Sequence, residues 1–493
     1  MNHKKKKNMS PFKKLLPFIL SIAIVIQFAS CAVGALGNET ESLDKPKNII
    51  IFVSDGMGFN HIKATNYFQY GEANAQVFEQ PDWTNFAMAT YSSVMRVRDG
   101  DTIYSGGYNP QRAATDPQYI TRDATDSGAA GTALSTGKKT YNGSIGIGIY
   151  GDTLIHMSQA AKALGKATGI ITSVQLSHAT PASFIAHNEH RNNYTDIAKY
   201  ILFHSQANVI MGAGNPDFNN NGQPAETNPQ FVGNRDIWEI LKANDGRTVF
   251  ETPEGTFYVQ DATGDGLPDP WTLIQTREEF QEMASGPQPS RVFGVPQVHT
   301  TLQQGRTQIE DHTLPFQTPM NENVATLEEM TLAAINVLNQ NPNGFFAMVE
   351  GGAVDWASHG NNSARMIEEQ IDFNNSVNAA IEWVETYSNW DETLIIVTSD
   401  HECGYLTGPG EPDPIYPTVT NNGKGNLPGM DWHSGGHTNV LVPLFAKGPG
   451  AQYFKLMARE HDPVYGPFIQ NTDIASLVFL MWGKPEIEVH KLN

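Results

Sequence analysis

The stretch 48–54, Asn-Ile-Ile-Ile-Phe-Val-Ser, is an unbroken run of mostly β-branched and aromatic side chains. Such a run is typical of a strand buried on both faces, as in a parallel sheet. The four residues that follow, Asp55-Gly56-Met57-Gly58, indicate that the strand passes directly into a loop. Asp55 would therefore lie at the carboxyl end of a strand, which is where open α/β sheets bind their ligands.

Four further segments repeat this pattern, at 167–172, 344–349, 394–398 and 440–446. Pro443 in the last segment predicts an edge strand or a strand end, because proline cannot donate to a sheet ladder. Apolar residues at helical spacing predict amphipathic helices, at 153–164, 323–339 and 363–387. Strands that alternate with helices predict the α/β class, with a large, mostly parallel central sheet sandwiched by helices.

Residues from about 212 to 322 differ in composition from the rest. They are rich in Gly, Asn, Pro, Gln and Thr and contain few long apolar runs. We interpret them as an irregular insertion that forms a cap over one edge of the core. The acids and glycines of 261–269 are spaced like a short calcium loop, and 217–222 begins like an EF-hand loop with Asn228 in place of its final Glu. Calcium binding and plain polar turns both remain open for this insertion.

The N-terminus has the three parts of a secretory signal. Six lysines lie within 4–14, an apolar run follows from Leu15 to about Phe28, and small residues surround Cys31. The apolar run is short for a membrane-spanning helix, so we expect export. The predicted organisation is a signal peptide, a polar tether and the main domain, at 1–31, 32–46 and 47–493.

Cys31 and the three residues before it, Phe-Ala-Ser, resemble a bacterial lipoprotein cleavage box, although Phe28 stands where Leu is usual. Two outcomes stay open: a lipid anchor on Cys31, or cleavage nearby that releases a soluble protein. The expected location is the periplasm, or the outer membrane or cell surface. Besides Cys31 the chain has only Cys403, so without Cys31 no intrachain disulfide is possible and the core and bound metals must hold the fold.

The charge of the chain is strongly negative. Residues 1–30 carry six lysines and no other charged side chain apart from a histidine counted as neutral, so removing them takes the formal charge from −20 to −26. Phosphate backbones attract basic surfaces, so this acidity argues against a nucleic-acid-binding surface.

A second informative stretch is 125–133, Thr-Asp-Ser-Gly-Ala-Ala-Gly-Thr-Ala. Ser127 lies between an acid and a glycine, just before small residues that predict the first turns of a helix. Free N–H groups and the helix dipole attract anions there, and small residues let a phosphate approach closely. An ordinary Asp or Ser N-cap has the same local sequence, so a catalytic Ser127 requires an activator elsewhere in the chain.

Acids and histidines gather at the ends of the predicted strands. The set is Asp55, Glu350, Asp355, His359, Asp400, His401 and His437. Any one of them could be a solvated acid or a satisfied histidine. Carboxylates clustered at buried strand ends, however, are very costly without a cation. Mixed oxygen and nitrogen donors suit Zn²⁺ and leave an oxygen-rich corner for Mg²⁺.

Five motifs together closely resemble those of the alkaline phosphatases. They are Val-Ser-Asp-Gly-Met-Gly at 53–58, Asp-Ser-Gly at 126–128, Met-Val-Glu-Gly at 348–351, Ser-Asp-His at 399–401 and His-Thr at 437–438. They follow the family's order and span nearly the whole chain after the leader. The resemblance implies an alkaline phosphatase-like fold and hydrolysis of phosphate monoesters through a phosphoserine on Ser127. It also implies two zinc ions, a third metal that is normally magnesium, and a homodimer.

The resemblance further implies a role for each site residue. The first zinc would be held by Asp355, His359 and His437. The second zinc, beside Ser127, would be held by Asp55, Asp400 and His401. The third metal would be held by Asp55, Thr180 and Glu350. Arg191 matches the arginine that grips the phosphate, on the strength of its flanking matches at 178–182 and 186–187.

Two positions depart from the best-known enteric bacterial pattern and look like other branches of the family, including marine bacterial enzymes. His178 stands in place of Asp and could ligate zinc directly, so we expect Mg²⁺ to be held weakly. Trp356 stands in place of Lys, which removes a cation near the phosphate. Cys403, next to the Ser-Asp-His motif, is interpreted as a buried side chain without a catalytic role.

Two alternative functions stay open. One is a phosphodiesterase or sulfatase of the same superfamily, and the other is a non-catalytic surface protein that binds metal or phosphate. Such phosphodiesterases usually use Thr, and sulfatases need a modified Cys or Ser in another motif. Ser127, together with Arg191 and Glu350, favours the monoesterase.

Overall fold

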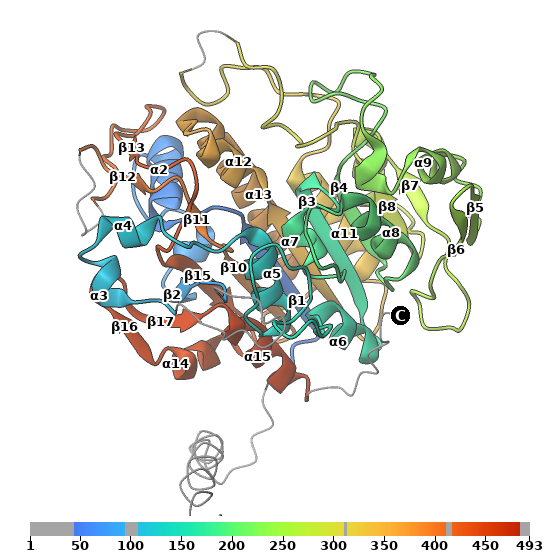
Figure 1. Ribbon diagram of the computed structural model, residues 1–493, viewed down its shortest axis with the longest axis horizontal. Coiled ribbons are helices and arrows are strands. Elements are labelled where there is room, and N and C mark those ends of the chain that lie inside the picture. Colours follow the sequence, from blue (N-terminus) through green and yellow to red (C-terminus); the bar gives the residue numbers. More distant parts are fainter. Residues whose placement is uncertain (1–43, 94–106, 310–312, 411–416, 484–493) are drawn as a thin grey trace, which may run out of the picture. The chain divides into compact units, whose positions relative to one another are not determined.

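The predicted strands pair into one sheet in the computed structural model, which describes residues 44–93, 107–309, 313–410 and 417–483 (Figure 1). From Lys45 onward the chain clusters as one unit. The sheet has eleven strands in the order β16-β17-β2-β15-β10-β1-β9-β3-β4-β8-β7. Their bounds in that order are Glu460–Asp462, Gly466–Gln470, Thr84–Ala89, Val442–Lys447, Thr393–Thr398, Asn48–Ser54, Phe345–Gly351, Ala167–Gln175, Val209–Ala213, Val292–Gly294 and Thr272–Ile274.

The sheet is mostly parallel, as predicted. Every neighbouring pair from β10 to β7 is parallel, whereas β15 runs antiparallel to both of its neighbours. Of the two expectations for Pro443, an edge strand is wrong, because β15 lies between β2 and β10, whereas a strand end is confirmed, because Pro443 is the second residue of β15. Proline is tolerated there because the ladder with β10 covers only residues 445–447, so Pro443 is paired on one side alone.

Strand β1 shows why the sheet is covered on both faces. Ile49, Ile51 and Val53 belong to an apolar cluster with residues of α5, α6 and α15. Ile50 and Phe52 belong to a second cluster, with residues of α11 and α13. Successive side chains of a strand point to opposite faces, so the run 48–54 needs helices on each side.

Helices lie on both sides of the sheet (Figure 1). Those of the core are α2 Phe59–Tyr70, α5 Ser127–Thr136, α6 Met157–Ala163, α7 Ala179–Ala182, α8 Tyr194–Phe203, α11 Leu327–Leu338, α12 Ala353–His359, α13 Ser363–Tyr387 and α15 Thr472–Met481. Shorter ones are α3 Pro110–Ala113, α4 Pro117–Ile120 and α14 Phe454–Met457. The helix predicted over 363–387 is confirmed, and the other two begin four residues later than expected. Thr326 explains one of these starts, because its side chain caps α11 at the amide of Glu329.

The segment predicted as an irregular insertion contains regular elements. It contains α9 (Arg235–Lys242), α10 (Arg277–Met283) and a hairpin of β5 (Val249–Thr252) and β6 (Gly255–Tyr258). Strands β7 and β8, however, extend the parallel sheet beyond β4. These two strands have three residues each, too few to show a strand pattern in the sequence.

The predicted signal peptide with Cys31, and the tether up to residue 43, lie outside the described residues. Within the part of the chain that is described, no helix combines the length and apolar character needed to cross a bilayer.

The carboxyl ends of β1, β9 and β10 meet in the middle of the sheet. Asp55 directly follows β1, Glu350 is the penultimate residue of β9, and Asp400 lies two residues after β10. Nearby, β11 (Glu402–Cys403) pairs with β14 (His437–Thr438), and β12 (Leu406–Thr407) with β13 (Asp431–Trp432). The sheet thus gathers the predicted site from distant parts of the sequence.

Candidate active site

Ser127 is the first residue of helix α5, as its local sequence predicts. Asp126 is the N-cap, and its carboxylate accepts a hydrogen bond from the Ala129 amide at 2.9 Å. The Ser127 side chain is nonetheless free for other contacts, and its Oγ lies 3.2 Å from His401 Nε2. Close packing behind it depends on Gly131, since a Cβ there would lie 2.9 Å from Ser183 Cβ next to α7. The N-cap and the reactive position are therefore two adjacent residues.

Three groups of side chains around Ser127 could each hold a metal ion, and in each group the ligand atoms lie within 4.8 Å of one another. We call them the first, second and third groups. The first group is Asp355, His359, Cys403 and His437. The second is Asp55, Asp400 and His401. The third is Asp55, His178 and Glu350.

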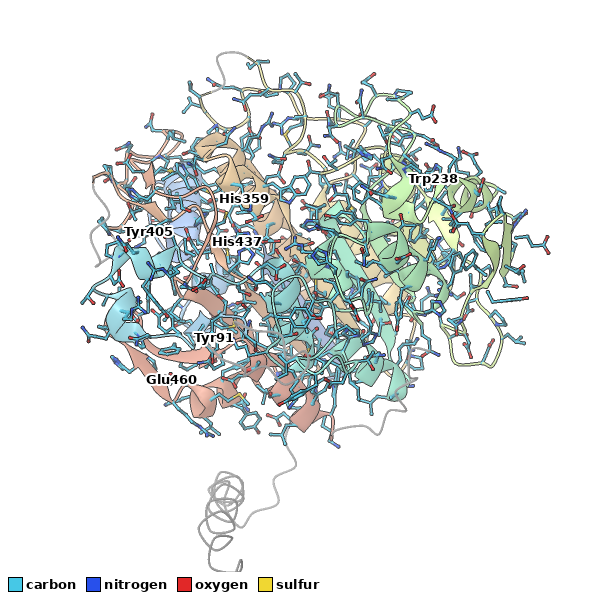
Figure 2. All side chains as sticks on the ribbon, viewed as in Figure 1. Tyr91, Trp238, His359, Tyr405, His437 and Glu460 are labelled. Carbon is cyan, nitrogen blue, oxygen red and sulfur yellow. The ribbon has the colours of Figure 1, made fainter. Side chains whose placement is uncertain are left out.

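These groups contain every predicted metal ligand except Thr180. That residue is nevertheless beside the third group, because its hydroxyl donates to Asp55 Oδ2 at 3.3 Å. In the first group, His359 and His437 come from α12 and β14, and their Nε2 atoms are 3.2 Å apart (Figure 2). Distant segments therefore place the predicted donors around shared points.

The donors fit divalent cations, because several of them are buried and make no hydrogen bond within the described residues; three of the carboxylate oxygens face only the site's own histidines, at 3.2–3.4 Å. Carboxylate oxygens without a hydrogen bond are Asp55 Oδ1, Glu350 Oε1, Asp355 Oδ1 and Asp400 Oδ2, and ring nitrogens without one are His178 Nδ1 and His401 Nδ1. Leaving such groups buried and unpaired costs several kcal/mol each. Divalent cations bound to these atoms would offset the cost of burying them.

The electrostatics of the protein alone lead to the same conclusion. Burial, with the nearby Asp355, raises the pKa of Asp55 to about 7. Burial and the other carboxylates also raise the pKa of Glu350 and Asp400 well above its usual range. Asp355 is the exception: burial opposes ionisation, but His437 and His359 outweigh it and lower its pKa. Without added positive charge, these acids cannot all be ionised near neutral pH.

Arg191 faces the same space as Ser127. Its Nη1 donates to Asp126 Oδ2 at 2.9 Å, and Nη2 lies 3.4 Å from His178 Nε2. The N-cap residue of α5 therefore also orients the guanidinium. Arg191 and Ser127 line the same pocket, and Asp126, next to Ser127 in sequence, holds the guanidinium there.

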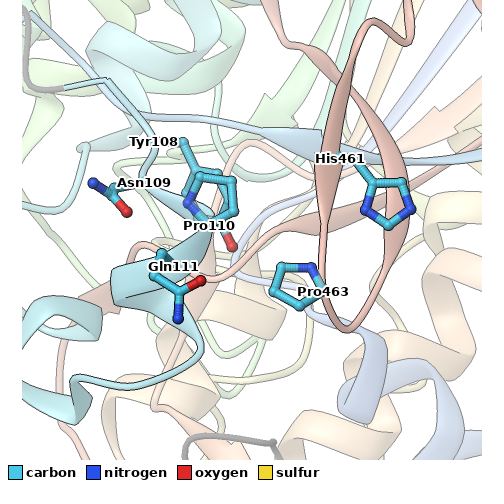
Figure 3. Close-up of a pocket in the computed structure, with 6 residues that line it drawn as sticks. All are labelled: Tyr108, Asn109, Pro110, Gln111, His461 and Pro463. Carbon is cyan, nitrogen blue, oxygen red and sulfur yellow. The ribbon is translucent and has the colours of Figure 1, made fainter.

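A pocket of about 450 Å³ lies away from this chemistry, between Tyr108 and His461 (Figure 3). A second, of about 430 Å³, is lined by Ser127, His178, Arg191, Gln304, Asp355, Trp356, His359 and His437. We assign the site to the second, because Ser127, Arg191 and the metal-ligand candidates Asp355, His359 and His437 line it, whereas the first contains only His461 of these residue types. Gln304 is the lining residue that the sequence did not predict.

Gln304 belongs to the insertion and follows no recognisable motif. It is brought to the pocket by its neighbour Arg306, which is buried and donates to Glu368 of α13 at 2.8 Å. The same guanidinium donates to the carbonyls of Gln303, Thr318 and Pro319. The hydrogen bond from Arg306 to Glu368 joins segments far apart in the chain, so no local sequence pattern predicts it.

Cys403 is buried, as predicted, but it is not remote from the site. Its sulfur is one of the four donors of the first group. Burial and the neighbouring Asp355 raise the pKa of its thiol. The sequence could show only that Cys403 follows His401 by two residues, not which way the sulfur points.

In the structure, acidic side chains of both candidate calcium loops bind other groups of the protein. Asp217 binds Arg235, Lys242 and the Trp238 indole, so its carboxylate is already occupied. In the loop 261–269, Asp261 and Asp269 accept hydrogen bonds from backbone amides of the loop itself. Neither loop is among the candidate metal groups of the described residues. Calcium binding here stays a prediction without structural support.

The fold and the site together define a class of protein: a metal-binding hydrolase of the α/β type, with a serine at a helix N-terminus. The family model described as alkaline phosphatase matches residues 46–425. The chain belongs to the alkaline phosphatase family.

Relatives and solved structures agree with this assignment. Alkaline phosphatase H of Pseudomonas aeruginosa (strain UCBPP-PA14) is 31% identical over 366 residues, which is 73% of this chain and 70% of the relative. Alkaline phosphatase 4 of Bacillus subtilis (strain 168) is 28% identical over 81% of this chain and 73% of the relative. The structure of alkaline phosphatase from the Antarctic bacterium TAB5 covers 90% of this chain and all of its own, with 22% identity and a TM-score of 0.59.

Proposed function

We propose that the protein hydrolyses phosphate monoesters through a phosphoserine intermediate on Ser127. The observation that carries this proposal is the position of the Ser127 hydroxyl. It is buried at the N-terminus of α5, 3.2 Å from His401 Nε2, and it lines the same pocket as Arg191. Positive charge, helix dipole and a nucleophile therefore converge on one point, as phosphoryl transfer requires.

The residues of the chain have distinct tasks in this reaction. Ser127 gives up its hydroxyl proton to solvent and its Oγ attacks phosphorus, while the ester oxygen departs on the opposite side and takes up a proton from water to leave as the alcohol. Arg191 binds two non-bridging phosphate oxygens through its planar fork, and Asp126 holds that fork in place. Water then attacks the phosphoserine, which releases inorganic phosphate and restores the hydroxyl of Ser127.

We propose that the first and second groups hold zinc. Two imidazoles with a carboxylate, and two carboxylates with an imidazole, are donor sets that Zn²⁺ commonly takes. Divalent cations at these groups would supply positive charge that lowers the pKa of the serine hydroxyl and stabilises the attacking and leaving oxygens. Asp55 belongs to the second and third groups, so one carboxylate couples the two positions.

We propose that the third group takes magnesium, held weakly because His178 is a ligand that magnesium disfavours. One solved structure is a histidine-to-aspartate variant of the TAB5 enzyme with Mg bound in its M3 site. We expect His178→Asp to raise the magnesium affinity by about tenfold or more, since it adds a hard, anionic oxygen donor. Equilibrium dialysis followed by metal analysis measures this, and an unchanged magnesium content would contradict the assignment of the third ion.

The reaction is tested by comparing p-nitrophenyl phosphate with bis(p-nitrophenyl) phosphate. We expect the monoester to be preferred by several orders of magnitude, whereas a preference for the diester or for a sulfate ester would favour the alternative enzymes. Acid quenching should trap a phosphoryl group on the peptide that contains Ser127. Ser127→Ala should abolish both the hydrolysis of the monoester and the trapped phosphoryl group. Turnover that survives this change would refute the phosphoserine route. A wild-type protein that binds metal and phosphate without turnover would be a binding protein.

We also propose that the protein is exported and carries a lipid on Cys31. This rests on the leader sequence, with its lysines, apolar run and small residues before Cys31. Detergent phase partitioning of the wild type and Cys31→Ser tests it. The wild type should enter the detergent phase and the variant the aqueous phase; partitioning of both into water would refute the anchor. Dimerisation is proposed from the family alone and is read from the mass in solution.

A further inference from the structure

Cys403 belongs to the first group, and its place in the fold is fixed by the backbone. It lies in β11, directly opposite His437 in the pairing with β14. Its amide donates to Gly56 O at 3.0 Å, in the loop that carries Asp55. The backbone of Cys403 is therefore held between the loops of two ligand-bearing segments, and its side chain is fully buried.

The four donor atoms of the first group lie close to one another. The Cys403 sulfur and the donor atoms of Asp355, His359 and His437 all lie within 4.8 Å of one another. Ligands of one zinc ion lie about 3 to 4.5 Å apart, given metal–ligand bonds of about 2.0–2.3 Å. In addition, Asp355 is almost fully buried, and its Oδ1 makes no hydrogen bond but lies 3.3 Å from Nε2 of His437, another member of the group. An ion at this point would satisfy that oxygen and touch the sulfur.

The sulfur also leaves room for substrate. Asp355, His359 and His437 line the active-site pocket, whereas Cys403 is not among its lining residues. The thiol is therefore buried next to the group without lining the pocket. An ion held by all four side chains would bind substrate by taking a fifth ligand from the pocket side, as catalytic zinc does when it becomes five-coordinate.

We propose that Cys403 Sγ is a protein ligand of the ion held by Asp355, His359 and His437, which makes this a mixed nitrogen, oxygen and sulfur site. The inference rests on the proposed metal-dependent function. On binding, the S–H bond is replaced by a sulfur–metal bond and the proton passes to solvent. A thiolate favours zinc, cobalt or cadmium over magnesium or manganese, so the first group should select thiophilic ions.

X-ray absorption at the zinc edge tests the proposal without any assay of activity. The sample is the full chain carrying Cys31→Ser, so that Cys403 is its one cysteine, reconstituted with zinc. We expect a sulfur scatterer at about 2.3 Å besides nitrogen and oxygen at about 2.0–2.1 Å. Cys403→Ser in the same background should lose the sulfur shell, and its zinc affinity at the first group should fall at least tenfold. Circular dichroism checks that this variant is folded.

The X-ray absorption spectrum of the Cys31→Ser protein shows whether sulfur binds the ion, even if Cys403→Ser does not fold. A zinc shell of nitrogen and oxygen alone would overturn the proposal, even if Cys403→Ser binds zinc more weakly, because the thiol would then act through Asp355. Cobalt gives an independent readout, since a sulfur-to-cobalt charge-transfer band must be present. A protein that retains no zinc would refute the proposed function itself, which is a different outcome from zinc bound without sulfur.

Discussion

Trp356 gives the active-site pocket an indole where the enteric pattern has a cation. Its ring lies edge-on to His178, with 5.7 Å between ring centroids, and both residues line the pocket with Arg191. Among the residues that line the pocket, Arg191 is therefore the one whose side chain is positively charged at any pH of interest. The resulting site should release phosphate readily, because product binding depends on few fixed positive charges.

A lysine at this position should tighten product binding. We expect Trp356→Lys to lower the inhibition constant of inorganic phosphate about five- to tenfold, because an ammonium near a phosphate adds about 1–1.4 kcal/mol in a partly solvated site. Competitive inhibition of p-nitrophenyl phosphate hydrolysis measures it. Trp356→Gln is the matched control, since it removes the indole without adding charge. Equal constants in the two variants would show that charge at this position does not govern product binding.

Helix α5 can carry the nucleophile because it packs closely against the segment of α7. A Cβ on Gly131 would lie 2.9 Å from Ser183 Cβ and 3.1 Å from its Oγ. Distances this short require one of the two elements to move. The small residues 128–133 are therefore a packing requirement of the element as well as a route for phosphate.

We expect Gly131→Ala to lower the free energy of unfolding by about 1–2 kcal/mol, because overpacking outweighs the better helix propensity of alanine. Catalysis should fall as well, since α5 carries Ser127. Urea unfolding of Gly131→Ala, Ser183→Gly and the double variant measures the coupling. The double variant should be more stable than the sum of the single effects predicts. Strict additivity would show that the two residues do not compete for space.

At this scale the sequence predicts long elements well and short ones poorly. Helix α13 shows its full 25 residues as an amphipathic pattern, and β1 is an uninterrupted apolar run. Strands β7 and β8 were missed because three residues carry no period. Their pairing with β4 comes from long-range contacts, which local propensity does not encode.

In the molecule as a whole, a buried acidic cluster joins α13 to the insertion. Burial, together with Asp372 and Glu368, raises the pKa of Glu369 to about 8, and burial raises the pKa of Asp372 to about 7. An acid whose pKa is higher when folded than when unfolded destabilises the fold as pH rises. The loss of stability caused by Glu369 should begin above about pH 4.5, which is the usual pKa of Glu, and should be complete above about pH 8.

Glu369→Gln should remove that part of the pH dependence. Glutamine mimics the protonated acid, so we expect equal stability of variant and wild type at pH 4 and a gain of more than about 1 kcal/mol at pH 9. Urea unfolding at several pH values measures it. Glu385→Gln, exposed near the end of the same helix, is the control and should change little. A gain that is the same at pH 4 and pH 9 would exclude ionisation as its cause.

Removal of the metal ions should lower the stability of the whole fold. Ions that bind only the folded state stabilise it, and without them the carboxylates at the ends of β1, β9 and β10 are left uncompensated. We expect chelation to lower Tm by about 10 °C or more, reversed by zinc. Calorimetry measures this shift. Ser127→Ala should show the same shift, since it keeps the ligands; an unchanged Tm in both proteins would mean that the groups bind no ion tightly.

The sequence by itself determined the α/β class, the main strands and helices, and the chemical types of the site residues. Apolar periodicity and strand-end acids are local, so they can be read along the chain. Only the tertiary structure decided that Cys403 lies within the first group and that Gln304 of the insertion lines the pocket. These depend on loop conformation and on contacts between segments far apart in sequence, such as Arg306 with Glu368, whose energies no local pattern contains.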